Sequence, residues 1–102
     1  MTRIGDETIC NFDHGRKSSI GTTAVQLTTI SVHAARGVQL KAASANSGLV
    51  YVGNSDVTAD AADATDGFPL APGEGLFLPV DDPSRIYVVG SAASQKVFFV
   101  VL

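Results

Sequence analysis

Residues 86–102 read IYVVGSAASQKVFFVVL, two apolar runs separated by a short stretch of Gly, Ala and Ser. Both runs are rich in β-branched and aromatic residues, which favour strands, and residues 90–95 supply a turn between them. Phe98 and Phe99 are adjacent, so they must point to opposite faces of their strand. We therefore expect at least one of the two rings to leave the core of the monomer.

Similar runs recur toward the N-terminus at intervals of roughly ten residues. In residues 37–42 the apolar side chains of Val38, Leu40 and Ala42 alternate with polar ones, which predicts a strand with one face toward solvent. Residues 49–52 are apolar at every position, which predicts a strand that is covered on both faces. Strands at this spacing are typical of a sandwich or a barrel.

Two further segments complete the pattern. In residues 22–32 the alternation changes phase at Thr28-Thr29, which predicts a strand that is interrupted there by a bulge or a bend. Residues 67–80 alternate on either side of Pro72-Gly73, a pair that favours a type II turn and predicts a hairpin-like unit.

The chain of 102 residues has room for one domain. We expect an all-β fold, a compact antiparallel β-sandwich of jelly-roll-like form, over residues 22–102. In residues 1–21 the hydrophobic positions are too scattered for a strand or helix period, so we expect an extended N-terminal arm. That arm is either a frayed terminus or a segment that orders against a neighbour.

Composition limits the class of partner. Hydrophobic residues make up 45% of the chain and charged residues 17%, and the net charge is −3. We expect no direct contact with nucleic acid, which needs clustered Lys and Arg. The longest apolar run, residues 97–102, is far below the ~20 residues that span a bilayer, so we expect no membrane segment. The first residues lack the apolar core of a secretion signal, which predicts synthesis in the cytoplasm.

Candidate reactive residues form no convincing site. Asp13-His14 precedes Ser18 and Ser19, but a catalytic triad needs rigid, mutually oriented groups, and these residues belong to the expected arm. Cys10 is the single cysteine, which excludes an intrachain disulfide and a multi-cysteine zinc site. We expect no enzyme activity, no catalytic residue and no cofactor.

A group of aspartates in residues 56–66 resembles a calcium loop at first sight. The group consists of Asp56, Asp60, Asp63 and Asp66. Their spacing lacks the order of an EF-hand loop and its closing bidentate Glu. We therefore expect solvated carboxylates and no metal.

The succession of strand and turn motifs over residues 35–102 resembles small virion structural proteins of tailed bacteriophages. The motifs are Gly37-Val38-Gln39-Leu40-Lys41-Ala42, Val50-Tyr51-Val52-Gly53-Asn54, Gly67-Phe68-Pro69-Leu70, Pro72-Gly73-Glu74, Leu78-Pro79-Val80-Asp81-Asp82 and Ile86-Tyr87-Val88-Val89-Gly90-Ser91. The resemblance implies a capsid cement or decoration protein on the capsid surface of the virion, or a β domain of a head or tail fibre.

The resemblance also implies which molecules the chain binds. We expect the chain to bind itself, as a homotrimer, and the major capsid protein, stabilising the shell by bridging neighbouring capsid subunits. The alternative is a module of a fibre that binds a receptor or a glycan. Basic residues of the arm either meet an acidic shell or are plain surface residues. The candidate interface residues are Arg3, Ile4, Ile9, Phe12, Arg16, Lys17, Phe98 and Phe99.

Overall fold

The computed structural model describes residues 13–59 and 66–102. Within them the regular structure consists of strands and one short 3-10 helix. The strands are β1 (Asp13–Ile20), β2 (Val25–Gln26), β3 (Val38–Ala42), β4 (Val50–Gly53), β5 (Phe68–Leu70), β6 (Gly75–Leu78), β7 (Tyr87–Gly90) and β8 (Gln95–Val101), and the helix is η1 (Pro83–Arg85). The prediction of an all-β fold is confirmed.

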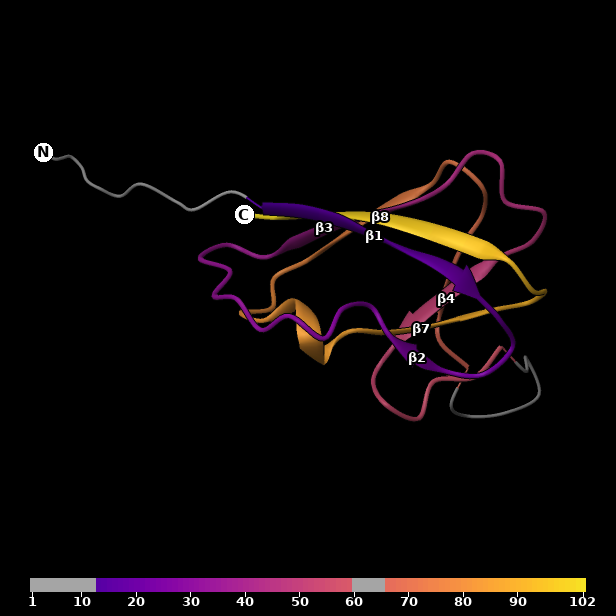
Figure 1. Cartoon of the computed structure of the whole chain (residues 1–102), viewed down its shortest axis with the longest axis horizontal. Helices are drawn as coiled ribbons and strands as arrows, with labels where there is room; N and C mark the ends of the chain where they lie inside the picture. Colours follow the sequence, from indigo (N-terminus) through magenta and orange to yellow (C-terminus); the bar gives the residue numbers. More distant parts are fainter. Residues whose placement is uncertain (1–12, 60–65) are drawn as a thin grey trace, which may run out of the picture.

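The strands form two antiparallel sheets that pack face to face. Sheet A has the order β1-β8-β3-β6, and sheet B has the order β2-β7-β4-β5. Figure 1 shows β1, β3 and β8 in the upper layer of the view and β2, β4 and β7 in the lower layer. The sandwich that the spacing of strands and turns predicts is therefore present.

The strand order is that of a jelly roll. The pairs β1·β8, β2·β7 and β3·β6 are antiparallel, as is β4·β5, so the chain pairs like one long hairpin folded at its middle. The additional pairs β3·β8 and β4·β7 close this hairpin into two four-stranded sheets. Eight strands in two such sheets define the jelly-roll class, so this part of the prediction is confirmed.

The core lies between the sheets and uses alternate residues of each strand. In β3, Val38, Leu40 and Ala42 are buried, and the polar residues between them are exposed, as the alternation predicts. In β4 only Val50 and Val52 are buried and the tyrosine between them is half-buried, so the prediction that both faces are covered is wrong for this strand. Burial on both faces occurs instead in β7.

The N-terminal arm predicted over residues 1–21 is wrong in its second half. Asp13–Ile20 form β1, an edge strand of sheet A that pairs with β8. The alternation of apolar residues does not identify this strand, because its inward positions include Asp13, Gly15 and Lys17. A register shift before Ile20, with Ser19 at φ 56°, also breaks the period of two. Residues 1–12 lie outside the described residues.

The strand predicted over residues 22–32 is shorter than expected. Only Val25–Gln26 pair with β7, and no strand continues past the phase change. The Thr28 hydroxyl accepts a hydrogen bond from the backbone N–H of Ile30 at 3.1 Å. Such local side-chain bonds compete with the ladder of a sheet, so the phase change marks a bend, which is one of the two predicted alternatives, and not a bulge within a strand.

The predicted turn at Pro72-Gly73 is present and connects β5 in sheet B with β6 in sheet A. The two strands therefore do not pair with each other, and the predicted hairpin-like unit is wrong. The N–H of Glu74 donates to the carbonyl of Ala71 at 2.9 Å, and Gly73 has φ 86°. A positive φ at the third residue is the requirement of a type II turn that favours glycine. This turn fixes where β6 starts along the edge of sheet A.

Candidate functional site

The structure describes four of the eight candidate interface residues. Arg3, Ile4, Ile9 and Phe12 lie outside the described residues. Arg16 and Phe98 are partners across β1·β8, so their side chains share one face of sheet A. Phe98 is 42% exposed, which confirms that one of the two adjacent rings leaves the core.

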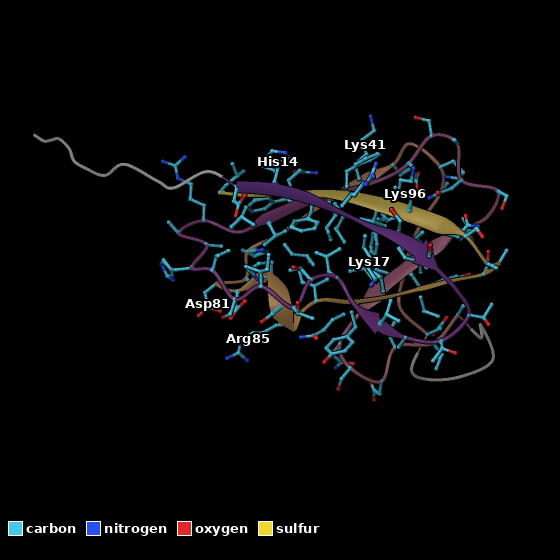
Figure 2. The ribbon with its side chains drawn as sticks, viewed as in Figure 1. His14, Lys17, Lys41, Asp81, Arg85 and Lys96 are labelled. Atoms are coloured by element: carbon cyan, nitrogen blue, oxygen red, sulfur yellow. The ribbon has the colours of Figure 1, made fainter. Side chains whose placement is uncertain are left out.

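The other two described candidates point inward. Phe99 is buried in the core between the sheets, so its assignment to an interface is wrong. Its ring covers Gly15 on β1, where a Cβ atom would lie 2.6 Å from the ring. Lys17 pairs with the buried Val97, so it too lies on the inward side of its strand, and Figure 2 shows it directed toward sheet B.

The outward face of sheet A, hereafter the outer face, consists of the strand positions that alternate with the buried ones. Two rows of register partners cross all four strands. One row is His14, Val100, Gln39 and Phe77, and the next is Arg16, Phe98, Lys41 and Gly75. Lys96 follows on β8, between two buried residues.

The outer face is basic and aromatic. Arg16, Lys41 and Lys96 are three of the seven Lys and Arg residues of a chain whose net charge is −3. No Asp or Glu occupies an outward strand position of sheet A, and the ion pair within the described ranges, Arg85 with Asp81 at 3.8 Å, lies elsewhere. Figure 2 shows Lys41 and Lys96 on one side of the molecule and Asp81 on the other.

Exposed aromatic rings accompany these charges. Phe77 is 43% exposed on β6, and Phe98 lies two strands away on β8. Exposed Phe in a strand favours contact with another macromolecule, because aromatic side chains provide much of the energy of protein interfaces. The outer face therefore combines apolar anchors with positive charges that form no ion pair with a described residue.

An apolar groove runs beside the outer face at the β6 edge, between the two sheets. This groove, hereafter the β6 groove, has a volume of about 320 Å³. It is lined by Leu76, Leu78, Val80, Phe68, Ile86, Val52, Gly53, Asn54 and Arg85. Phe68 is 56% exposed, and Leu76 and Leu78 are half-buried although they face the core side of β6.

Asp13 and His14 do not form a catalytic pair. Because they are neighbours on β1, their side chains point to opposite faces of sheet A. The contact between them is a hydrogen bond from the backbone N–H of His14 to the Asp13 carboxylate at 2.8 Å. Cys10, the single cysteine, lies outside the described residues.

The aspartates of the expected calcium-like loop are only partly described. Asp56 and Asp66 line one open hollow of about 370 Å³, and Asp60 and Asp63 lie outside the described residues. In residues 13–59 and 66–102 no three His, Cys, Asp or Glu residues gather closely enough to hold a metal ion.

A polar cluster holds the loop after β2 against η1. The carboxylate of Asp82 accepts hydrogen bonds from the hydroxyl of Ser31 at 2.5 Å and from the backbone N–H of Ser84 at 2.9 Å. These bonds, with the Ser84 hydroxyl and the nearby Arg85, lower the pKa of Asp82 below its ordinary value. The cluster lines an open hollow with His33, but its bonds are those of a helix cap.

Comparison of the chain with protein-family models, with curated proteins and with solved structures gives no match. The part of the chain that the structure describes contains no helix of the length and apolar character that a membrane span requires. The outer face and the β6 groove are thus the features from which a function is inferred. The alternation in residues 75–78 could have revealed the second exposed ring, Phe77, at the sequence level.

Proposed function

We propose that this chain is a structural protein of the virion of a tailed bacteriophage, a capsid cement protein that binds neighbouring major capsid subunits and stabilises the shell as a homo-oligomer. Its place is the capsid surface. The observation that carries the proposal is the outer face of sheet A, where Arg16, Lys41 and Lys96 surround the exposed Phe98 with no carboxylate among them.

The jelly-roll fold is compatible with this role but does not select it. Jelly rolls serve in viral capsid proteins and also in lectins and cupins, so the argument rests on the surface. A cement protein must bind many copies of one site on the shell through a face that its own core does not need. The outer face meets this requirement, because the core uses only the inward residues of the same strands.

The chemistry of the outer face defines its partner as an acidic protein surface with apolar patches. Phe98 lies between Arg16 on β1 and Lys41 on β3, its register partners on either side. A ring in such a position acts as an anchor, and the surrounding charges direct the approach of an acidic partner and fix its register. Among the described residues, no Asp or Glu occupies an outward strand position of sheet A, and Asp81 lies on the other side of the molecule in Figure 2.

The test measures binding to the shell. Purified chain is added to expanded shells assembled from the major capsid protein of the same phage, and the bound fraction is determined by co-sedimentation. The combined variant Arg16→Glu, Lys41→Glu and Lys96→Glu should weaken binding at least about 100-fold, because it replaces attraction with repulsion. Phe98→Ala should weaken binding about 30-fold, as loss of a central anchor does.

Asp81→Lys is the matched control, since it reverses a charge on the opposite side of the molecule and outside the β6 groove. Its binding should stay within about 2-fold of the wild type. Failure of the wild type to sediment with the shells would overturn the proposal, as would full binding by the triple variant. Salt-sensitive binding of oligo(dT) at physiological ionic strength would instead identify the face as a single-stranded nucleic acid platform.

A further inference from the structure

The four edge strands of the sandwich differ in how they are protected against pairing with another strand. Natural proteins block exposed edges with charges, prolines, bulges or very short strands. β2 has only two residues, and β5 carries Pro69 at its centre. β1 presents Arg16 and Lys17 and has an irregular register near its end. Three of the four edges are therefore protected.

The fourth edge, β6, has none of these devices. Residues 75–80 read GLFLPV and contain no charge, and the proline stands after the strand ends. The pairing of β3 with β6 is regular over four consecutive residue pairs. Phe77 is 43% exposed at the centre of this strand. An exposed, apolar and regular edge is a template for another strand.

The hydrogen-bond pattern shows which groups the β6 edge offers. Gly37 exchanges both backbone hydrogen bonds with Leu102, at 3.3 and 2.9 Å, and the Ala42 N–H donates to the Glu74 carbonyl at 2.9 Å. Odd residues of β3 thus bond toward β8, and even residues bond toward β6. Because bonded pairs alternate along an antiparallel ladder, the N–H and C=O of Gly75 and Phe77 point to the open edge.

We propose that β6 pairs with the β6 strand of a second copy of this chain, antiparallel and around a two-fold axis at Phe77. In this register Phe77 exchanges two backbone hydrogen bonds with its counterpart. After Leu78 the chain turns out of the strand, because the N–H of Val80 donates to the Leu78 carbonyl at 2.8 Å, and Pro79 has no N–H with which to extend the ladder. The two Phe77 rings then lie side by side on the outer face as a cross-strand aromatic pair.

The second copy is favoured over another partner by the properties of the edges. Among the strands of residues 13–59 and 66–102, an identical chain offers β6 no other unprotected edge, so pairing between copies is β6 with β6 and has two-fold symmetry. Because residues 75–80 carry no charge, the paired strands of two net negative chains bring no like charges of their own into contact. The outer face behaves oppositely, since its cations would repel those of a second copy.

The β6 groove gives the contact its apolar area. Leu76 and Leu78 project into it from β6, and Phe68 flanks it from β5. Pairing of the two strands places the grooves of both copies next to each other, so these half-exposed side chains become covered. Ladder bonds and apolar burial then act at one site, as they do when a strand adds to an exposed edge.

This dimer departs from the trimer that the resemblance to phage proteins implies. The dimer can form without a shell, but its formation should affect how tightly the chain binds to one. A two-fold axis perpendicular to the sheet keeps both outer faces on the same side, so the dimer presents one continuous eight-stranded basic surface. Two linked faces bind an acidic shell more tightly than one face does.

The test compares Phe77→Lys with Phe98→Lys. The two rings have nearly equal exposure, 43% and 42%, and both lie on the outer face, but only Phe77 is on the edge. Mass is measured by sedimentation equilibrium over a range of concentrations. The wild type and Phe98→Lys should have twice the 10.5 kDa mass of one chain. Phe77→Lys should weaken dimerisation about 10-fold, because it removes the cross-strand aromatic pair and places two like charges directly opposite each other.

Amide hydrogen exchange supplies a second measurement that does not depend on a variant. The Phe77 amide should be protected at high protein concentration and should exchange freely on dilution, whereas the Leu76 amide, bonded within the sheet, should be protected at both concentrations. A monomeric wild type or a trimeric mass would overturn the proposal. So would equal dimerisation by both lysine variants, or a Phe77 amide that exchanges freely at every concentration.

Discussion

The inner and outer faces of sheet A are built from the same four strands, yet they differ in burial and in the types of residue that they carry. Inward positions such as Leu40 and Val97 are fully buried and apolar, whereas the neighbouring outward positions Lys41 and Phe98 combine positive charge with an exposed ring. The fold constrains one alternate set of residues and leaves the other free for contacts with other molecules. Substitutions at adjacent positions should therefore separate stability from binding.

The largest change in the free energy of unfolding is expected for a substitution in β3, which lies inside sheet A. Leu40→Ala removes a fully buried side chain from β3 and should lower the free energy of unfolding by about 2–5 kcal/mol. Lys41→Ala, one residue along on the outer face, should change it by less than about 0.5 kcal/mol and weaken shell binding instead. Urea unfolding followed by circular dichroism measures both. Similar stability losses in the two variants would contradict the separation of the faces.

A smaller effect is expected where β1 and β8 meet on the inner face. Gly15→Ala places a Cβ atom 2.6 Å from the Phe99 ring and should destabilise the protein by about 1–3 kcal/mol. Gly21→Ala is the matched control, because nothing lies within 4 Å of its Cβ position. Combining Gly15→Ala with Phe99→Leu should recover part of the loss. Additive losses in this double-mutant cycle would show that the ring is not the cause.

The next smaller effect on stability is expected for Gln95, the buried polar residue of β8. The Gln95 side chain accepts from the Gly48 N–H at 2.9 Å and donates to the Ala93 carbonyl at 2.7 Å, and it is fully buried. Gln95→Leu leaves these backbone groups without partners and should cost about 1 kcal/mol or more. Lys96→Leu, the outward neighbour, should be close to neutral in thermal unfolding. Unchanged stability in Gln95→Leu would mean that water replaces the amide.

The sequence predicts the inner face well wherever alternation is strict. In residues 37–42 a period of two identifies the strand, its buried side chains and its solvent side, because one face packs on the core and the other does not. The spacing of such strands predicts a sandwich or a barrel, and the strand order then defines the jelly roll. The adjacency of Phe98 and Phe99 predicts that they separate, but which ring is inside depends on the pairing of β8 with β1.

The outer face and the edges could not be predicted from the sequence. β1 lacks an apolar period because a glycine makes room for a ring from the neighbouring strand, a contact that exists only after folding. Arg16 and Lys41 are 25 positions apart along the printed sequence and become neighbours of one ring through two separate registers. Whether residues 75–78 form an edge depends on the strand order, which local patterns do not specify.

The smallest expected effect is a change of stability with pH. It should not arise from the outer face, whose strand positions carry no carboxylate. Asp82 lies in the cap of η1, where its bonds to Ser31 and Ser84 lower its pKa below the ordinary 3.8. A carboxylate with a lowered pKa in the folded state stabilises the protein above the unfolded-state pKa. That contribution is lost as the pH falls below about 4 through the folded-state value. Thermal unfolding between pH 2 and 6 should show a small decrease in stability toward acid that is absent in Asp82→Asn and reduced in Ser31→Ala. An equally steep decrease in Asp82→Asn would assign the acid sensitivity to another carboxylate.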